Sequence, residues 1–300
     1  MEVTTQTVHI PDRSVTLSIR REDLIHPVVS GNKFRKLKYN LLEAAKQNHT
    51  RLLTFGGAFS NHIAAVAAAG RMHGFDTIGI IRGEELEGKV RENPTLSFAA
   101  NCGMKLVFVS REAYRQKANA DNITAWQEQF GSFYLLPEGG TNALAVKGCE
   151  EILTQADADF DYLCCAAGTG GTAAGLINAS QEGQQVLVFP SLKGNFLGDE
   201  IRKFTSGKNW RIIPDYHFGG YGRITPELVS FINRFHLENG VPLDPVYTGK
   251  MLFGVMDMIN RGSFPTGSKI LAIHTGGLQG IEGMNNKLKR NKQPLITTNV

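Results

Sequence analysis

The stretch Arg51-Leu52-Leu53-Thr54-Phe55-Gly56-Gly57-Ala58-Phe59-Ser60-Asn61-His62 joins a short apolar run to an alanine-rich segment. The run over 51–55 predicts a strand, and the residues from Ser60 to His73 predict a helix. The two glycines between them indicate a tight turn, or a place where the backbone approaches a ligand. A strand, a glycine-rich turn and a helix in this order form the repeating unit of an α/β fold.

The same alternation recurs along the 300 residues. Further strands are expected at 77–81, 105–109, 162–166, 186–189 and 269–273. Further helices are expected at 33–47, 94–101, 123–130, 142–155, 172–179, 225–238 and 249–260. This pattern predicts an α/β fold with mostly parallel sheets. The strands fall into two groups, so we expect a smaller domain over 36–137 and a larger one from 1–35 and 138–300.

Glycine clusters follow three of the expected strands, after Phe55, after Ala167 and after His274. In open α/β sheets, ligands bind beyond the carboxyl ends of the strands. Three such loops directed into one crevice predict an active site between the two domains.

The segment Gly168-Thr169-Gly170-Gly171-Thr172 lies between an expected strand and an expected helix. Backbone N–H groups at a helix start, together with the two threonine hydroxyls, are suited to a phosphate. A plain turn is the other interpretation. The segment lacks the Lys-Ser/Thr of a Walker A loop and matches only part of the dinucleotide fingerprint, so it gives little support to a nicotinamide oxidoreductase.

Lys33 lies in Ser30-Gly31-Asn32-Lys33-Phe34-Arg35-Lys36-Leu37, a turn that opens a basic helix. Neighbouring cations lower the pKa of an amine and favour its nucleophilic neutral form, which suits a Schiff base. The alternative is a solvated basic helix. Ser60 and Asn61 are either the cap of their helix or a site for a carboxylate or a cofactor oxygen. His62 is structural or catalytic, and Ser60 does not lie in the Gly-x-Ser-x-Gly of a hydrolase.

Tyr221 and Tyr247 each lie in a turn-rich segment, Phe218 to Gly222 and Pro245 to Lys250. A tyrosine in such a place is either a general acid or base or a packed ring.

Composition limits the partners. The net charge of +4 is mild, and no basic stretch is interleaved with aromatics, which argues against nucleic acid. The four cysteines show no metal-ligand spacing, so no metal is expected, and their number fits a reducing compartment. The N-terminal segment has no apolar core of a signal peptide, and no run is long enough to span a membrane. We therefore expect a cytoplasmic protein that binds small anionic ligands.

In combination, these motifs resemble the pyridoxal-phosphate enzymes with the tryptophan synthase β-subunit fold. The chain is most similar to the branch that holds 1-aminocyclopropane-1-carboxylate deaminase and D-cysteine desulfhydrase. The matching pieces recur in family order over roughly 20–280: Arg21-Glu22-Asp23, Gly31 to Leu37, Gly56 to His62, Glu92-Asn93-Pro94, Pro137 to Gly140, Gly168 to Thr172, Pro245 to Lys250 and His274 to Gly277. The segment before Arg21 is shorter than in typical members.

The resemblance implies a role for each predicted residue. Lys33 would hold pyridoxal 5'-phosphate and later move the substrate α-proton. Ser60, Asn61 and His62 would meet the substrate, and Asn61 would also reach the ring hydroxyl of the cofactor. Tyr221 and Tyr247 would flank the substrate as acid/base groups. The remaining cofactor contacts would come from Gly168, Thr169, Gly170, Gly171, Thr172, Thr248 and Thr275.

Thr248 is the informative difference within the branch. The deaminase has a glutamate at this position and a leucine at the position of Thr275, whereas the desulfhydrase has threonine at both. A hydroxyl supports a protonated pyridine ring less well than a carboxylate does. Expulsion of a thiolate should tolerate that weaker electron sink better than opening of a cyclopropane ring.

The resemblance therefore implies an enzyme of the lyase, hydrolase or deaminase type that acts on a small amino acid. The favoured reaction is β-elimination from D-cysteine, and deamination of 1-aminocyclopropane-1-carboxylate is the alternative. A carrier or sensor that binds the cofactor without catalysis is an alternative of another class. The resemblance also implies a homodimer.

Overall fold

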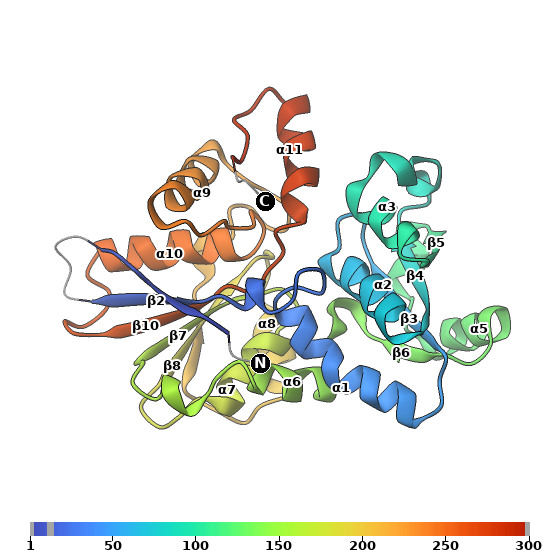
Figure 1. Ribbon diagram of the computed structural model, residues 1–300, viewed down its shortest axis with the longest axis horizontal. Coiled ribbons are helices and arrows are strands. Elements are labelled where there is room, and N and C mark those ends of the chain that lie inside the picture. The colour runs from blue at the N-terminus through green and yellow to red at the C-terminus, as the bar shows by residue number, and fades with distance from the viewer. Residues whose placement is uncertain (1–2, 11–14, 298–300) are drawn as a thin grey trace.

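Two separate sheets organise the chain (Figure 1). In the computed structural model, which describes residues 3–10 and 15–297, six strands form one sheet in the order β1-β2-β10-β7-β8-β9. Four strands form the other in the order β5-β4-β3-β6. Strands β1 and β2 pair antiparallel, and the other neighbouring pairs are parallel. The predicted fold class, with two mostly parallel sheets flanked by helices, is confirmed.

The larger sheet contains β1 (Thr5–Val8), β2 (Thr16–Arg20), β7 (Tyr162–Ala167), β8 (Gln185–Pro190), β9 (Trp210–Ile212) and β10 (Lys269–Ile273). The smaller sheet contains β3 (Arg51–Gly56), β4 (Asp76–Arg82), β5 (Lys105–Val109) and β6 (Tyr134–Leu136). The helices are α1 (Asn32–Lys46), α2 (Asn61–His73), α3 (Pro94–Asn101), α4 (Arg111–Arg115), α5 (Ala120–Phe130), α6 (Ala143–Glu150), α7 (Gly171–Ala179), α8 (Leu197–Arg202), α9 (Pro226–Asn239), α10 (Thr248–Asn260) and α11 (Gly280–Arg290).

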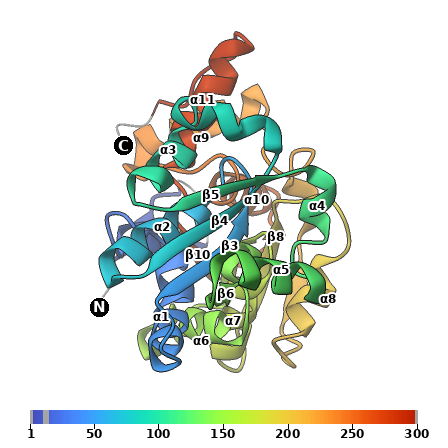
Figure 2. The ribbon, with the colours of Figure 1, turned by 90° about the vertical axis from the view of Figure 1, so that its right-hand side faces the viewer.

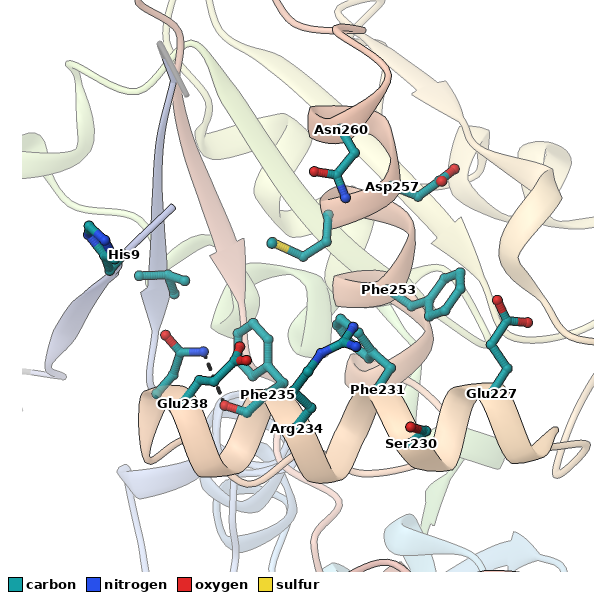
Figure 3. A pocket seen from close by; sticks show the side chains of 13 residues that line it. His9, Glu227, Ser230, Phe231, Arg234, Phe235, Glu238, Phe253, Asp257 and Asn260 are labelled. Atoms are coloured by element: carbon teal, nitrogen blue, oxygen red, sulfur yellow. Dashed lines mark hydrogen bonds between the residues drawn. The ribbon is translucent and has the colours of Figure 1, made fainter. Parts of the chain in front are cut away.

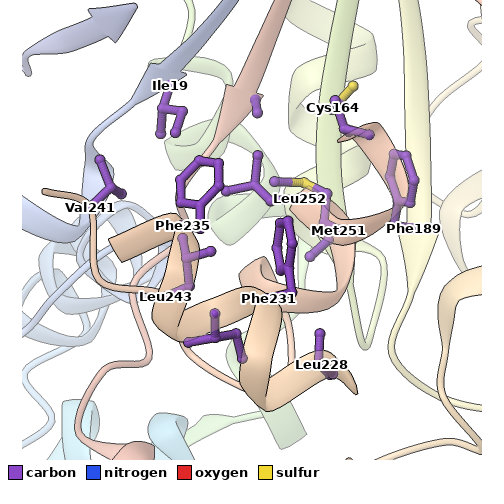
Figure 4. Close-up of a cluster of buried hydrophobic side chains, with 14 of the residues drawn as sticks. Ile19, Cys164, Phe189, Leu228, Phe231, Phe235, Val241, Leu243, Met251 and Leu252 are labelled. Carbon is purple, nitrogen blue, oxygen red and sulfur yellow. The ribbon is translucent and has the colours of Figure 1, made fainter. Parts of the chain in front are cut away.

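Helices cover both faces of the larger sheet, because its central strands are apolar on both sides. Helices α9 and α10 cover one face, and α6 and α7 cover the other (Figure 1). Figure 4 shows the first layer, where Phe231, Phe235 and Leu252 meet Ile19 and Cys164 of the sheet. The second layer packs Ala173, Ala174 and Leu176 of α7 against β7 and β8. Cys164 and Cys165, which are neighbours in β7, are both buried.

The smaller sheet stands beside the larger one, and Figure 2 shows its strands from the front. Its core combines the alanine-rich face of α2 with α1, α3 and the strands. Helix α1 links the two halves of the molecule, because it packs against α6 on one side and α2 on the other. Lys33, near the start of α1, therefore lies where the two halves meet.

All six predicted strands are present, but β1, β2, β6 and β9 were not predicted. Strands β6 and β9 have three residues each, too few for a periodic pattern. Strand β2 buries Ser18 and Arg20 among its apolar residues, and a buried arginine hides the apolar signature of a strand. Arg20 forms an ion pair with Asp157, which compensates the charge.

The predicted helix over 142–155 is wrong in its second half. Helix α6 ends at Glu150, and a short 3-10 helix follows over Gln155–Asp157. Thr154 and Asp157 form a capping box, in which Asp157 accepts from both the N–H and the hydroxyl of Thr154. This reciprocal cap starts a new turn and so ends the longer helix. Helices α4, α8 and α11 were not predicted.

Candidate active site

The loops that follow β3 and β10 meet the start of α1 in one place. Gly31 has a φ of 64°, and a Cβ there would lie 2.0 Å from the carbonyl oxygen of Thr275. The Asn32 N–H donates to the same oxygen at 3.2 Å. A Cβ on Gly277 would lie 2.8 Å from Nδ2 of Asn61. These contacts allow no side chain at either glycine, so the glycines set how closely the segments approach.

Lys33 is the second residue of α1, and its side chain is partly buried. Its Nζ donates to Oδ1 of Asn32 at 3.0 Å, and Nδ2 of Asn32 donates to the Thr172 hydroxyl at 2.8 Å. Burial, followed by the nearby charge of Lys36, lowers the pKa of Lys33 from its ordinary value of 10.5 to about 7. A large fraction of this amine is therefore neutral and nucleophilic near neutral pH. The bridging role of Asn32 was not predicted.

The glycine loop, Gly168 to Thr172, connects β7 to α7, and its Thr172 is linked to Lys33 through Asn32. Gly170 caps α7 with a φ of 81°, and no side chain of the cap accepts the first N–H groups of the helix. A Cβ on Gly168 would lie 3.2 Å from the phenol oxygen of Tyr247. Free N–H groups at a helix start, approached closely by small residues, are suited to an anion.

Lys36 is a buried lysine that is linked to the glycine loop by hydrogen bonds. Its Nζ donates to the Gly139 carbonyl at 3.1 Å and to the Thr141 hydroxyl at 2.9 Å. The hydroxyls of Thr141 and Thr169 lie 2.6 Å apart. The Lys36 amine is thus connected to the glycine loop through the hydroxyls of Thr141 and Thr169. Sequence reasoning missed this role, because Lys36 stands among basic residues that look like a solvated face.

Ser60 and Asn61 open α2. Ser60 is the N-cap, and its hydroxyl accepts from the Ile63 N–H at 3.3 Å. The capping interpretation of Ser60 is therefore confirmed. Because the hydroxyl is the acceptor in this bond, its own proton stays available for a ligand. Asn61 lies against Gly277, so α2 begins beside the loop that carries Thr275.

His62 packs against β3 and Gly140. Its ring is buried, its Nε2 lies 2.8 Å from the Thr54 hydroxyl on β3, and it fills the space beside Gly140. Burial, followed by the charges of Lys33 and Lys36, lowers the pKa of His62 well below 6.5. The ring is therefore neutral, and its contacts favour a packing role over the predicted contact with substrate.

Tyr221 and Tyr247 come from separate segments and meet at the glycine loop. Their ring centres lie 6.1 Å apart at an interplanar angle of 67°. Tyr247 precedes α10, whereas Tyr221 lies in the loop before α9 and is 46% exposed. Burial raises the pKa of Tyr247 well above 10. Its phenol therefore keeps its proton and can donate a hydrogen bond.

Asp244, which was not predicted, organises the start of α10. Its buried carboxylate accepts from the N–H groups of Val246, Tyr247 and Thr248 at 2.9, 2.8 and 2.7 Å. The signal for it was an aspartate in a turn before a helix, where its side chain can accept from backbone N–H groups two to four residues on. Thr248 is fully buried, and its hydroxyl has no hydrogen-bond partner within the described part of the chain. An orphaned buried hydroxyl at a site indicates a ligand atom that completes it.

A pocket of about 390 Å³ lies elsewhere, between β1, α9 and α10 (Figure 3). Phe231, Phe235 and Phe253 form part of its wall, and Arg234 and Glu238 lie near its rim. None of the predicted site residues lines it. The chemistry of the molecule therefore concentrates around Lys33 and not in this pocket.

Among residues 3–10 and 15–297, no group of three His, Cys, Asp or Glu side chains is placed to hold a metal ion. None of the helices described there has the length and apolar character that a bilayer crossing requires. All four cysteines are free thiols.

Comparison with known proteins agrees with this arrangement. The family model described as pyridoxal-phosphate dependent enzyme matches residues 2–276. A Pyrococcus horikoshii protein, provisionally named 1-aminocyclopropane-1-carboxylate deaminase, is 32% identical and covers 90% of this chain and 87% of its own. The mitochondrial bifunctional D-cysteine desulfhydrase/1-aminocyclopropane-1-carboxylate deaminase of Arabidopsis thaliana is 31% identical, with 88% of this chain and 73% of the relative covered.

The crystal structure of a homologue of 1-aminocyclopropane-1-carboxylate deaminase superposes with a TM-score of 0.82 at 28% identity. The superposition covers 97% of this chain and 94% of that one. The names of the relatives include both deaminase and desulfhydrase, so they do not separate the two substrates. They give no support to a hydrolase, and that part of the expected activity class is wrong.

Proposed function

The chain belongs to the pyridoxal-phosphate dependent enzymes of the 1-aminocyclopropane-1-carboxylate deaminase and D-cysteine desulfhydrase family, and from this premise we propose that it eliminates sulfide from D-cysteine. The net reaction consumes one water and yields pyruvate, ammonia and sulfide. The carbon–sulfur bond breaks with both electrons on sulfur, and the α-proton is removed.

The residues around Lys33 fit pyridoxal phosphate. Lys33 would hold its aldehyde carbon, because the amine has a lowered pKa and is partly buried. The start of α7, with Thr169 and Thr172, would hold the phosphate, and the orphaned hydroxyl of Thr248 would face the ring nitrogen. When bound, this cofactor supplies an electron-accepting ring that stabilises negative charge on the carbon next to the substrate amine.

Lys33 would also move the α-proton. An amine with a pKa of about 7 can accept a proton and return it near neutral pH, which is what a general base requires. Asn32 holds Nζ through its Oδ1, and Thr172 holds Asn32 in turn. This chain fixes the direction of the amine relative to the glycine loop.

The start of α2 and the two tyrosines would bind and orient the substrate. The hydroxyl of Ser60, together with the first N–H groups of α2, is suited to the substrate carboxylate. Tyr247, which keeps its proton, would donate a hydrogen bond to the departing sulfur, with Tyr221 beside it. Tyr221 is the more exposed of the two and closes the substrate side toward solvent.

The observation that carries the choice of D-cysteine is the surroundings of Thr248. The carboxylate next to it, Asp244, is already occupied by three backbone N–H groups. The group left for the ring nitrogen is therefore an uncharged hydroxyl. Such a site supports departure of a good leaving group better than the opening of an unactivated ring.

The test is to incubate the pure, cofactor-loaded protein with D-cysteine, L-cysteine and 1-aminocyclopropane-1-carboxylate in parallel. Sulfide, pyruvate and 2-oxobutyrate are then assayed. We expect sulfide and pyruvate in equal amounts from D-cysteine, with a kcat/KM above that for the cyclopropane substrate. Release of 2-oxobutyrate at an equal or greater kcat/KM would establish the deaminase, a name that both reported relatives also carry.

A cofactor carrier or sensor predicts a different result, with a bound chromophore and no turnover across a broad panel of amino acids. We further propose a cytoplasmic homodimer, in line with four free thiols and the family resemblance. Sedimentation at several concentrations tests the dimer.

A further inference from the structure

The segment that carries Tyr221 has little intrinsic preference for one shape. We call residues 217–222 the tyrosine loop. Its φ values are positive at Phe218 (52°), Gly219 (86°), Gly220 (111°) and Gly222 (63°). Glycine adopts many backbone conformations in the unfolded chain, so a run of glycines must be held by contacts from outside.

Lys250, which the proposed reaction does not use, supplies such contacts. Its side chain is only 2% exposed, although lysine is rarely buried. The amine donates to the carbonyl oxygens of His217 and Gly220, each at 2.9 Å. The two bonds bracket the residues at which the backbone turns. Burial without these partners would be costly, so the amine and the loop stabilise each other.

Lys250 is one of three anchors along a face of α10. Positions 250, 253 and 257 share that face, because they are three and then four residues apart. Phe253 packs edge-on against Phe218 with ring centres 5.0 Å apart, and Asp257 accepts from the Tyr216 hydroxyl at 2.7 Å. These two anchors hold the residues before Gly219. The amine of Lys250 holds the Gly220 carbonyl, directly before Tyr221.

Helix α10 also begins directly after Tyr247, and Lys250 follows Tyr247 by three residues. The first turn of α10 therefore positions Tyr247 where the turn begins and holds the tyrosine loop, through Lys250, where the turn ends. We propose that Lys250 is a positioning residue, which holds the tyrosine loop so that the Tyr221 phenol stays against Tyr247 at the substrate side of the site. The proposal rests on the proposed function only for the chemical use of the Tyr221 hydroxyl.

The loop also provides a matched control. Lys287 of α11 donates to the Gly222 carbonyl at 3.1 Å, but this hydrogen bond is exposed. Both lysines bond backbone oxygens of the same loop and differ in burial. Replacement of Lys287 by methionine should have little effect, because water takes the place of an exposed amine.

The first measurement does not need turnover. Hydrogen exchange of the cofactor-loaded protein is followed by mass spectrometry of peptides that cover 217–222, in wild type, Lys250→Met and Lys287→Met. Exchange should become about tenfold faster in Lys250→Met, because the loop loses two hydrogen bonds from a buried amine and so opens more easily. It should stay unchanged in Lys287→Met. Unchanged exchange in a folded Lys250→Met protein overturns the proposal.

The second measurement separates positioning from general stability. We expect Lys250→Met to lower kcat/KM for D-cysteine about tenfold in the wild type and to have no further effect in a Tyr221→Phe background. An equal loss in both backgrounds means that Lys250 acts on the fold and overturns the proposal. If Lys250→Met does not fold, Lys250→Gln, which retains an amide donor, takes its place in both measurements. A wild type without turnover would refute the proposed function, while the exchange result would still decide on Lys250.

Discussion

The two sides of the active site are built in different ways. The cofactor side, formed by α1 and the glycine loop, is held by side chains from distant segments: Lys33 to Asn32 to Thr172, and Lys36 to Thr141 to Thr169. On the substrate side, Tyr221 is 46% exposed, and the tyrosine loop is rich in glycine. The contrast indicates a cofactor side that is held by several buried pairs, and a more exposed substrate side whose tyrosine loop keeps its shape through a few anchors such as Lys250. Changes on the cofactor side should therefore weaken cofactor binding, whereas changes on the substrate side, such as Lys250→Met, should lower kcat/KM for the substrate.

The largest effect is expected from Lys33→Ala. Loss of both the covalent anchor and the general base should lower kcat by a factor on the order of 10³ or more. Borohydride reduction of the wild type followed by peptide mass mapping should place the phosphopyridoxyl group on Lys33. A label on Lys36 would reverse the roles assigned to these two lysines.

The second effect concerns pH and uses the protein freed of cofactor. Below a pKa of about 7 most Lys33 is protonated, and the neutral fraction falls about tenfold for each pH unit. The rate of cofactor uptake, followed by absorbance, should therefore rise with pH up to about 7 and then level off. A rate that continues to rise toward pH 10 would show that the amine is solvated and not buried.

The same lowered pKa fixes the sign of a stability effect in the cofactor-free protein. Between about pH 7 and 10.5 the unfolded chain binds a proton at Lys33 that the folded chain does not, so the contribution of Lys33 to unfolding free energy rises with pH. Below about pH 7 both states are protonated and the contribution is constant. The unfolding free energies of wild type and Lys33→Met, measured with urea at pH 6 and pH 9, isolate this contribution of Lys33.

How much of this could be read from the sequence differs between the two sides. Lys33, Ser60-Asn61 and the glycine loop were predicted, because each lies at a strand end or helix start that local patterns reveal. Asp244 was missed although the three N–H groups that it binds lie only two to four residues along the chain. Lys36, Asn32 and Lys250 were not given roles, because each acts through a backbone or hydroxyl group distant in sequence. The polar strand β2 was missed for the same reason, since Arg20 is compensated by a partner 137 residues away. Local patterns locate the ends of elements, but they do not show which buried polar groups pair.

Lys36→Met is expected to have a moderate effect on the cofactor side. It leaves the Gly139 carbonyl without a buried donor and removes one of the two partners of the Thr141 hydroxyl, at a cost of about 1–3 kcal/mol. Retention of the cofactor during dialysis, measured by absorbance, should weaken about tenfold or more. Lys38→Met is the matched control, because Lys38 is on the same helix but pairs with Glu151 at the surface. Equal losses in the two variants would mean that positive charge on α1, and not the bond to Thr141, retains the cofactor.

The smallest effect on stability is expected from Thr248→Val, which tests the boundary between the two sides. Valine has nearly the shape of threonine, and the Thr248 hydroxyl has no partner among the described residues, so no protein hydrogen bond is lost. The free energy of unfolding of the cofactor-free protein should change by less than about 1 kcal/mol, and an apolar group in that buried position should favour stability. In the loaded enzyme, by contrast, the absorbance of the cofactor should shift and D-cysteine turnover should fall. If stability falls by several kcal/mol while the absorbance stays unchanged, then the hydroxyl serves the fold, and the argument for elimination over ring opening loses its basis.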